Sequence, residues 1–384
     1  MKVNELPTPF YIVYEDKLRH NLQLIIDISK KADVKIIMAF KANALWKTFD
    51  IFKEYNVACT ASSLNELRLG REFLTEDVYS YCPAYTDATI DEYLAGSTHI
   101  TFNSVSQWEK FADKVREYNK TSGRHVSPGL RVNPHCSVIA TDLYNPALPG
   151  SRFGAKAEEL TERVPEGIEG LHFHALCEST SHDLAKVLAA FEKQFAHLLP
   201  QVKWVNMGGG HIMTRADYDT DHLVEVLHSF KARYPWLEVI LEPGSAFTWR
   251  TGDLVTEVVD VVENDGVKTA IVDVSFACHM PDTLEMPYKP SITEALGDAP
   301  VSGKPTYRLG GNSCLSGDYM GDWSFDKPLA QGDRLTLEDM NHYTTVKTNM
   351  FNGIQHPDIV FCNSNGDCTY LRKFTYDDYK NRMS

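Results

Sequence analysis

The feature that most limits how this chain folds is a strand-like run that recurs eight times within residues 34–244. Each run is short and rich in β-branched or aromatic residues, and stretches with apolar residues at helical spacing separate the runs. The runs cover residues 34–41, 56–62, 77–83, 99–104, 127–134, 170–174, 204–210 and 238–244. Strands and helices that alternate eight times are typical of a (β/α)8 TIM barrel. The sequence therefore predicts an α/β fold built on such a barrel.

The chain after residue 247 follows a different pattern. Short strand-like runs such as LVTEVVDVVE, KTAIVDVSF and DIVFCNSN succeed one another there, with Gly, Asp and Asn at the turns and little helical periodicity. The N-terminal segment PFYIVYE is a further strand that precedes the first helix of the barrel. We therefore predict two domains, a barrel over 18–247 and an all-β domain over 248–384 that residues 1–17 complete.

Composition excludes several classes of protein. The chain is 43% hydrophobic and 23% charged, which is ordinary for a globular protein with a large core. Its 38 Lys and Arg residues stand against 52 Asp and Glu residues, a net charge of −14 that argues against binding to nucleic acid or to an anionic membrane. No window approaches the ~18 apolar residues of a membrane span, and the first residues lack the apolar core of a signal peptide. We expect a cytoplasmic protein.

The eight cysteines carry little information about function. They lie at positions 59, 82, 136, 177, 278, 314, 362 and 368, and none of them forms a CxxC pair. This spacing predicts neither a structural zinc site nor a disulfide framework. We expect reduced thiols and no metal.

Polar residues follow many of the predicted strands. The C-terminal ends of barrel strands meet on one face, and that face carries the active site of a barrel enzyme. A single lysine or histidine after a strand is usually solvated or structural, but convergence of many strand ends on polar residues indicates an active site. The residues at these ends are Lys41, Ser62, Asn103, Arg131, His174, Gly208, Gly209, Gly210 and Glu242.

Several of these positions together describe a cofactor site. Burial makes it easier to deprotonate a lysine such as Lys41, and a neutral amine condenses with an aldehyde. The three glycines allow backbone N–H groups to approach an anion, although a glycine run alone also makes a tight turn. A carboxylate such as Glu242 keeps a ring nitrogen protonated, and an imidazole such as His174 stacks on the ring. This combination points to pyridoxal 5'-phosphate.

The same residues lie in longer motifs, which are FKAN with Trp46, TASSLNELRLG, TDLYNPALPGSRFG, GLHFHALCE, VNMGGGH, CHMPDTLEMPY and GGNSCLSGD. Over nearly its whole length the chain resembles the pyridoxal-phosphate-dependent decarboxylases with an alanine-racemase-like barrel (fold type III) and a C-terminal β domain. Within that family, the motifs are most similar to those of the carboxynorspermidine and carboxyspermidine decarboxylases. The resemblance implies a decarboxylation that yields norspermidine or spermidine and carbon dioxide in polyamine biosynthesis.

The resemblance also implies a role for each matching residue. Lys41 matches the lysine that carries the cofactor and returns to it after reaction, His174 the histidine that stacks on the cofactor ring, and Glu242 the carboxylate at the pyridine nitrogen. Residues that match the other cofactor contacts are Gly208, Gly209, Gly210, Gly244, Tyr343 and Arg131. Cys314 matches a cysteine that the partner subunit supplies across a dimer interface, which implies a homodimer with shared active sites. Cys314 is the candidate proton donor, and the sequence does not decide between this role and a purely positional one.

The implied substrate is a small carboxylated triamine, whose cationic amines need carboxylates as partners. Asp282 falls where related decarboxylases place an aspartate against the distal amine. Weaker candidates for binding the substrate are His279, Glu285 and Asp318. A cap, a turn or an ion pair explains any of these residues equally well. The acidic net charge is consistent with a polycationic substrate.

Two departures from the family pattern concern the site. Ser245 follows EPG, where many relatives have an arginine that binds the phosphate, so a neutral hydroxyl replaces a charged contact. Cys177 and Glu178 stand where ornithine decarboxylases have a small serine. The residues that replace the phosphate-binding arginine stay undetermined at this point.

Three alternatives remain open. Diaminopimelate decarboxylase acts on a substrate with a second carboxylate, and the missing arginine and the acid-rich HMPDTLEMPY argue against it. An alanine racemase has a tyrosine where this chain has Cys314. An inactive homologue that binds pyridoxal phosphate and acts as a regulator usually lacks the lysine or the cysteine, and here Lys41 and Cys314 are both present. The sequence does not decide between norspermidine and spermidine as product, because one methylene changes specificity by only ~1–3 kcal/mol.

Overall fold

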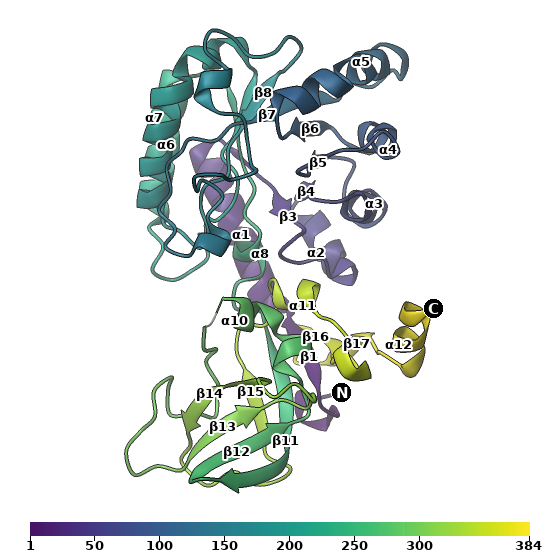
Figure 1. Cartoon of the computed structure of the whole chain (residues 1–384), viewed down its shortest axis with the longest axis vertical. Coiled ribbons are helices and arrows are strands. Elements are labelled where there is room, and N and C mark those ends of the chain that lie inside the picture. Colours follow the sequence, from purple (N-terminus) through teal and green to yellow (C-terminus); the bar gives the residue numbers. More distant parts are fainter. Residues whose placement is uncertain (287) are drawn as a thin grey trace. The chain divides into compact units, whose positions relative to one another are not determined.

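The computed structural model describes residues 1–286 and 288–384, so Pro287 of the CHMPDTLEMPY motif lies outside the described residues. The chain divides into two units (Figure 1). One unit is Asn21–Phe247, and the other combines Met1–His20 with Thr248–Ser384. The first boundary falls inside the long helix α1 (Glu15–Ala32).

The unit Asn21–Phe247 is built around a parallel sheet that closes on itself. Its strands are β2 (Lys35–Ile36), β3 (Met38–Ala39), β4 (Cys59–Ala61), β5 (Val78–Tyr81), β6 (His99–Phe102), β7 (Ser127–Arg131), β8 (Gly170–His172), β9 (Trp204–Asn206) and β10 (Glu238–Leu241). Neighbours in the chain pair in order from β3 to β10, and β10 pairs with β2. Because β2 and β3 are two pieces of the first predicted strand, the chain itself closes the ring. The predicted barrel is confirmed.

Helices follow most of the barrel strands, and Figure 1 shows them outside the ring of strands. They are α2 (Phe49–Glu54), α3 (Leu64–Phe73), α4 (Ile90–Gly96), α5 (Val105–Thr121), α6 (Ser181–Phe195), α7 (Thr220–Arg233) and α8 (Ser245–Thr248). Three of these helices, α3, α5 and α6, are capped at their N-termini by the hydroxyl groups of Ser63, Ser104 and Thr180. Each hydroxyl accepts a hydrogen bond from a backbone N–H group in the first turn of its helix. Such caps satisfy N–H groups that have no partner inside the helix.

Short 3-10 helices occur in both units. They are η1 (Val3–Glu5), η2 (Trp46–Thr48), η3 (Asp142–Tyr144), η4 (Ala157–Glu159), η5 (Ala196–Gln201) and η6 (Phe351–Gly353). The helix η3 lies in the TDLYNPALPGSRFG motif, and η6 lies in the segment that follows Tyr343. The helix η3 therefore belongs to a motif that the sequence singles out.

One large side chain fills part of the barrel interior. The indole of Trp204 packs in a buried cluster with Ile37, Ala58, Tyr79 and Ile240. Its Nε1 donates a hydrogen bond of 2.8 Å to Ser127 Oγ. The neighbouring strands place Gly129 and Gly170 against the ring, where a Cβ atom would come within 2.2 Å and 2.0 Å of it. These two positions must be glycine because the indole occupies the space of their side chains.

The substitution Gly170→Ala is expected to lower the free energy of unfolding by about 2–3 kcal/mol, since overpacking a filled core costs about 1–3 kcal/mol. Urea unfolding followed by circular dichroism measures the effect. Gly317→Ala is the matched control, because a Cβ atom at Gly317 meets no atom within 4 Å. Equal unfolding midpoints for the two variants would contradict this account of the barrel interior.

The second unit contains a mixed sheet. Its strands follow the order β14-β13-β12-β11-β1-β16-β17, and β15 also pairs with β11. The bounds are β1 (Phe10–Tyr14), β11 (Gly252–Asn264), β12 (Val267–Val272), β13 (Thr306–Gly310), β14 (Tyr319–Ser324), β15 (Arg334–Leu337), β16 (Asp358–Cys362) and β17 (Cys368–Arg372). The N-terminal strand β1 lies antiparallel to β11 and parallel to β16. The prediction that this strand joins the second sheet is thus confirmed.

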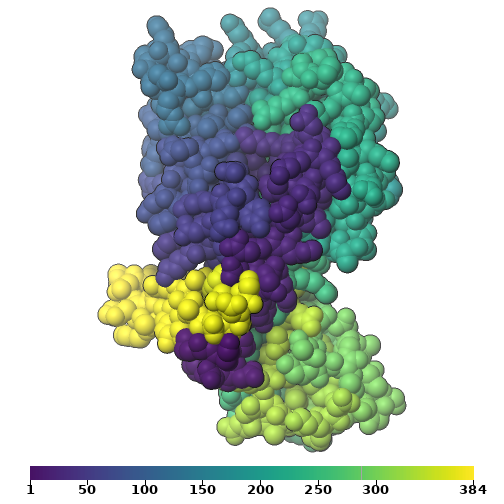
Figure 2. All heavy atoms as spheres, turned by 180° about the vertical axis from the view of Figure 1, so that it is seen from behind, coloured from purple at the N-terminus to yellow at the C-terminus, as the bar shows by residue number. Residues whose placement is uncertain are grey.

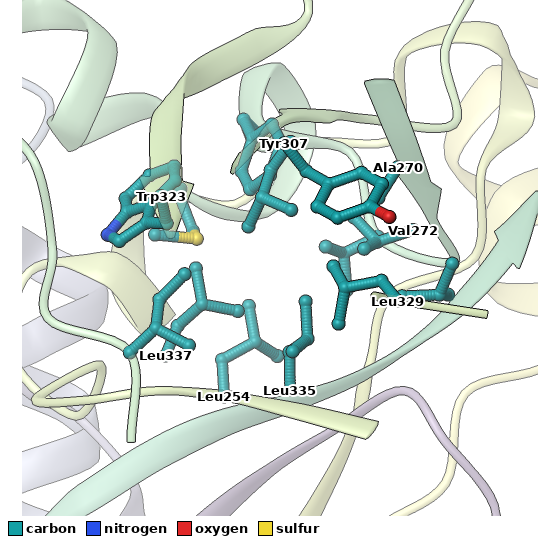
Figure 3. Packing of buried hydrophobic residues seen from close by; sticks show 14 of the residues in the cluster. Leu254, Ala270, Val272, Tyr307, Trp323, Leu329, Leu335 and Leu337 are labelled. Carbon is teal, nitrogen blue, oxygen red and sulfur yellow. The ribbon is translucent and has the colours of Figure 1, made fainter. Parts of the chain in front are cut away.

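In the space-filling view, purple N-terminal atoms lie beside yellow C-terminal atoms (Figure 2). Short helices interrupt the second unit, which the sequence predicted to be all-β. They are α9 (Phe276–His279), α10 (Pro281–Glu285), α11 (Thr344–Lys347) and α12 (Tyr376–Met383). A hydrophobic core that includes Leu254, Tyr307, Trp323 and Leu337 holds the unit together (Figure 3).

The expectation of eight reduced thiols is wrong for one pair. Cys362 and Cys368 form a disulfide bond. The two residues face each other across the β16–β17 hairpin, where they form the last pair of the register. The absence of CxxC spacing could not exclude this bond, because the pairing of the two strands brings the cysteines together. The cytoplasmic location stays a prediction.

Among the described residues, no helix combines the length and the apolar character that crossing a lipid bilayer requires.

Candidate active site

The ends of the barrel strands surround a pocket of about 640 Å³. Six residues that the sequence placed at the strand ends line this pocket, and they are Lys41, Ser62, Arg131, His174, Gly209 and Glu242. Each comes from the C-terminal end of a different strand, namely β3, β4, β7, β8, β9 and β10. A barrel brings such ends to one face, so residues far apart in the sequence meet in one place. Gly208, Gly210 and Gly244 belong to the same strand ends but do not line the pocket.

The side chain of Lys41 is exposed, and it lines the pocket that the ends of the barrel strands surround. The pKa of its ammonium group lies below the ordinary value. Desolvation is the main cause, and the positive charge of Arg131 acts in the same direction, while the carboxylate of Glu242 opposes them. A lysine in this setting gives up its proton more readily than a surface lysine. That is the property needed for attack on a carbonyl carbon.

Glu242 is buried and lies beside a histidine that the sequence analysis did not single out. His172 Nε2 lies 3.0 Å from Glu242 Oε1, and both side chains are less than 10% exposed. Burial alone would raise the pKa of Glu242, but His172, Thr60 and Lys41 hold it below the ordinary value, so the carboxylate is ionised. Burial lowers the pKa of His172, with Glu242 opposing the shift. His172 is two residues from His174, and alternate residues of a strand face the same side.

The ring of His174 has a fixed orientation. Its Nδ1 accepts a hydrogen bond of 3.0 Å from the backbone N–H of Gly209. Burial, together with the charges of Lys41 and Arg131, lowers the pKa of His174 well below its ordinary value. The ring is therefore neutral, and its remaining proton is on Nε2. A neutral, oriented imidazole is suited to stacking on an aromatic ring.

The glycine run offers fewer free backbone N–H groups to an anion than the sequence suggested. The N–H of Gly208 donates to Asn206 Oδ1 and the N–H of Gly209 to His174 Nδ1. Within the described residues, the N–H of Gly210 has no protein acceptor and is the one available to an anion. The run is nevertheless tightly packed, because a Cβ atom at Gly209 would lie 2.4 Å from Glu242 O.

Arg131 belongs to a hydrogen-bonded network at the pocket. Its Nη1 donates to Tyr81 Oη at 2.6 Å and its Nη2 to the backbone oxygen of His174 at 3.1 Å. Tyr81 Oη in turn donates to Asn103 Oδ1 at 2.8 Å. Tyr81 ends the third barrel strand, so the rule that strand ends carry the site would have found it.

A long segment supplies much of the pocket wall. It is part of the motif TDLYNPALPGSRFG, and we call residues 141–153 the wall loop. The members that line the pocket are Asp142, Leu143, Tyr144, Asn145, Pro146, Leu148, Pro149, Gly150, Ser151, Arg152 and Phe153. This motif supported the family resemblance, but the sequence assigned it no role. Asp142 is, with Glu242, one of two carboxylates among the lining residues.

The other predicted residues lie in the second unit, and two of them share a loop. Cys314 is exposed, and its backbone N–H donates to Asn352 Oδ1 at 2.9 Å. The carboxylate of Asp318 accepts hydrogen bonds from the N–H groups of Ala277 and Ser313, at 3.0 Å and 3.2 Å. Asp318 thus stabilises the loop that presents the Cys314 thiol, rather than offering a free carboxylate.

The candidates for binding the substrate have different surroundings. Asp282 is buried and accepts hydrogen bonds on Oδ2 from Tyr288 Oη and Thr344 Oγ1, whereas its Oδ1 has no partner among the described residues. Glu285 forms an ion pair with Lys347. His279 is fully buried, and burial lowers its pKa to about 3.

Tyr343 occupies the left-handed backbone region, with a φ of 54°, directly before α11. A bulky residue rarely adopts this conformation, because its Cβ crowds the backbone. A strained backbone conformation of this kind usually persists only where the surrounding structure holds the residue in place, and such residues are common at ligand sites.

The chain is similar in sequence to known decarboxylases. The sequence profile of the family described as "Pyridoxal-dependent decarboxylase, C-terminal sheet domain" matches residues 12–341. A carboxyaminopropylagmatine decarboxylase from Synechocystis sp. is 42% identical over 382 residues, which cover 100% of this chain and 97% of the relative. A carboxynorspermidine/carboxyspermidine decarboxylase from Campylobacter jejuni is 38% identical over 392 residues, which cover 100% of both chains.

Solved structures show the same similarity. The crystal structure of carboxynorspermidine decarboxylase from Campylobacter jejuni, complexed with norspermidine, matches with a TM-score of 0.88 and 38% identity. The match covers 98% of this chain and 100% of that one. The diaminopimelate decarboxylase from Helicobacter pylori, complexed with L-lysine, matches with a TM-score of 0.81 at 16% identity, and covers 99% of this chain and 98% of that one. At that identity the likeness concerns the fold alone.

Proposed function

Because this chain belongs to the pyridoxal-dependent decarboxylases with a C-terminal sheet domain, we propose that it removes the carboxylate of a carboxylated polyamine. The observation that carries the proposal is the meeting of Lys41, His174, Gly209 and Glu242 in one pocket. Full-length similarity to decarboxylases of carboxylated polyamines supports it. The diaminopimelate alternative has weaker support, since its relatives are 21–25% identical.

The names of the relatives define two candidate substrate types. Carboxynorspermidine and carboxyspermidine are triamines whose far end is an amine, and we propose these as the substrates because two relatives and one solved structure carry those names. Carboxyaminopropylagmatine ends in a guanidinium group instead. It is the second candidate because the relative named for it is 42% identical to this chain. Both types share a carboxylated aminopropyl group, which is where the reaction takes place.

The pocket fits pyridoxal 5'-phosphate, the cofactor of this family. The easily deprotonated amine of Lys41 suits the aldehyde of the cofactor. The ionised carboxylate of Glu242 suits a protonated ring nitrogen, and the neutral imidazole of His174 suits the aromatic face of the ring. The glycine run leaves no room for a Cβ atom at Gly209, which allows a ligand to approach the backbone closely. When bound, the cofactor supplies an electron sink for the electron pair that the departing carboxylate leaves behind.

Each of these residues has a distinct task in the proposal. Lys41 would hold the cofactor covalently through its amine. Glu242 keeps the ring nitrogen protonated, and His172 in turn keeps the carboxylate of Glu242 ionised and oriented. His174 supports one face of the ring. The groups that we propose for the phosphate are the N–H of Gly210, the Gly244 turn and Tyr343, with Arg131 as a nearby support.

Cys314 is the proposed donor of the proton to the carbon that lost its carboxylate. Its thiol is exposed on a loop that Asn352 and Asp318 hold in place. The neighbouring side chains of Leu315 and Phe351 are 45% and 50% exposed, which suits a surface that a second subunit covers. We therefore propose a homodimer in which the partner subunit supplies the cysteine.

Among the carboxylates of the second unit, Asp282 is the strongest candidate for a substrate amine. Its Oδ1 has no partner within the described part of the chain, and burial raises its pKa. A cation beside it would restore the ionised form. Glu285 already has Lys347 as its partner, and Asp318 is engaged within its loop.

The test of this proposal compares carbon dioxide release by the protein loaded with pyridoxal phosphate. The substrates are carboxynorspermidine, carboxyspermidine, carboxyaminopropylagmatine, meso-diaminopimelate and ornithine at one concentration. We expect release from the carboxylated triamines at least about tenfold above that from diaminopimelate or ornithine. Ornithine is shorter and lacks one of the amines, and diaminopimelate brings a second carboxylate, so each would leave polar groups of the site unpaired. Higher release from carboxyaminopropylagmatine would select the second candidate, and release from diaminopimelate alone would overturn the polyamine assignment.

A further inference from the structure

The wall loop leaves and rejoins the barrel at one narrow place, directly after β7. Val132 and Ala155 form a parallel bridge there, and the N–H of Ala155 donates to Arg131 O at 2.8 Å. Gly154 lies between this bridge and the wall loop with a φ of 81°, and a Cβ atom at that position would lie 2.8 Å from the carbonyl carbon of Val132. The loop is therefore closed at its base, and the base is adjacent to the pocket residue Arg131.

The side chain of Asn103 holds this base on both sides of Phe153. Its Nδ2 donates to the backbone oxygen of Arg152 at 2.8 Å, and its Oδ1 accepts from the N–H of Gly154 at 3.2 Å. Asn103 follows β6 and is thus attached to the rigid barrel. A single carboxamide therefore connects the wall loop to a neighbouring strand end.

Tyr81 connects Asn103 to Arg131. Its hydroxyl donates to Asn103 Oδ1 at 2.8 Å and accepts from Arg131 Nη1 at 2.6 Å. The guanidinium of Arg131, which is 3% exposed, also lies over the rings of Tyr81 and Phe153, at 4.8 Å and 4.4 Å from their centroids. Hydrogen bonds and ring contacts thus run without interruption from the wall loop to a buried cation in the pocket.

We propose that Tyr81 and Asn103 are positioning residues that hold Arg131 and the wall loop in one arrangement, and so determine the shape of the pocket that receives the substrate. The effect on substrate rests on the proposed function, whereas the effect on the loop does not. A buried guanidinium needs acceptors for its N–H groups, and within the described residues Tyr81 Oη is its one side-chain acceptor. Removal of that hydroxyl frees both Arg131 and Asn103 to move.

The first readout is independent of catalysis. Trypsin cleaves after arginine, and the backbone oxygen of Arg152 is the atom that Asn103 holds. A single intramolecular hydrogen bond changes an equilibrium about three- to tenfold. In Tyr81→Phe we expect cleavage between Arg152 and Phe153 to be about three- to tenfold faster than in the wild type, as followed by mass spectrometry. Asn103→Ala should show at least the same increase.

The second readout separates positioning from general destabilisation. In Tyr81→Phe we expect the KM for the carboxylated triamine to rise about three- to tenfold, with kcat changed less than about threefold. Tyr85→Phe is the matched control, because Tyr85 is a buried tyrosine near the same strand whose hydroxyl donates to the backbone oxygens of Ser80 and Thr101 and not to the loop. Its cleavage rate and KM should equal those of the wild type.

Distinct outcomes separate this inference from the proposed function. If Tyr81→Phe and Asn103→Ala are cleaved at the rate of the wild type, the positioning role is wrong even if the enzyme is active. If the wild type releases no carbon dioxide but the two variants are cleaved faster, the proposed function fails and the connection between Tyr81, Asn103 and the loop stands.

Discussion

The substitution Lys41→Ala is expected to lower turnover by about 10⁴-fold or more, a loss of the size that follows removal of a nucleophile. Lys41 is the lysine in the pocket, and its lowered pKa makes the neutral amine accessible. Without this amine the protein has no group that holds the cofactor covalently. The variant should therefore also lose the visible absorbance of bound cofactor after gel filtration.

The control for this variant is Lys53→Ala. Lys53 belongs to the same unit, lies on the surface of α2 and pairs with Asp50. It should keep both the turnover and the absorbance of the wild type. A Lys41→Ala protein that retains covalently held cofactor would show that another lysine carries it, and would move the active site away from the end of β3.

The second large effect is expected for Glu242→Gln, with a decrease in kcat of about 10²- to 10³-fold. Loss of one preorganised electrostatic contact has effects of about this size. The amide keeps the shape of the side chain and its close contact with His172, but it cannot hold a ring nitrogen protonated. Cofactor content should stay near that of the wild type, because Lys41 is intact.

Glu238→Gln provides the comparison for this variant. Glu238 begins the same strand, β10, and is exposed, so its replacement removes an equal charge from the far end of the strand. Its kcat should equal that of the wild type. A kcat of Glu242→Gln within about threefold of the wild-type value would show that no charge is needed at this position, and the role of Glu242 would then be structural.

Local patterns explain why the barrel could be predicted. Each strand–helix unit has its own turn signals and its own spacing of apolar residues, so all eight strands were visible in the sequence. The division of the first strand was not visible, since it depends on partners: the N–H of Ile37 donates to Leu241 O on one side, and that of Met38 to Ala58 O on the other. The strands β14 and β17 were not recognised, and both pair across irregular registers.

The position of the site was predictable because strand ends meet on one face of a barrel. That rule gave Lys41, Arg131, His174 and Glu242 in advance, and these four line the pocket. The same rule would also have found Tyr81, but the contacts among these residues were not predictable, because each contact joins residues far apart in the chain. Tyr81 lies 50 positions from Arg131, and the contribution of the wall loop follows from the way its base closes.

Sequence reasoning also could not show which backbone donors are already used. The glycine run was expected to offer its N–H groups to a phosphate, but Asn206 and His174 accept from two of them. The disulfide between Cys362 and Cys368 has the same origin, since it depends on the register of two strands. In each case a neighbouring side chain in the folded protein decides the chemistry of a residue whose type was visible from the start.

The central claim is that this chain uses pyridoxal phosphate to decarboxylate a carboxylated polyamine. The most direct measurement follows carbon dioxide and free triamine from carboxynorspermidine, for protein loaded with pyridoxal phosphate and for protein stripped of it. We expect both products in equal amounts over many turnovers with the loaded protein, and neither with the stripped protein. Absence of both products from the loaded protein, with this substrate and with carboxyspermidine and carboxyaminopropylagmatine, would contradict the account.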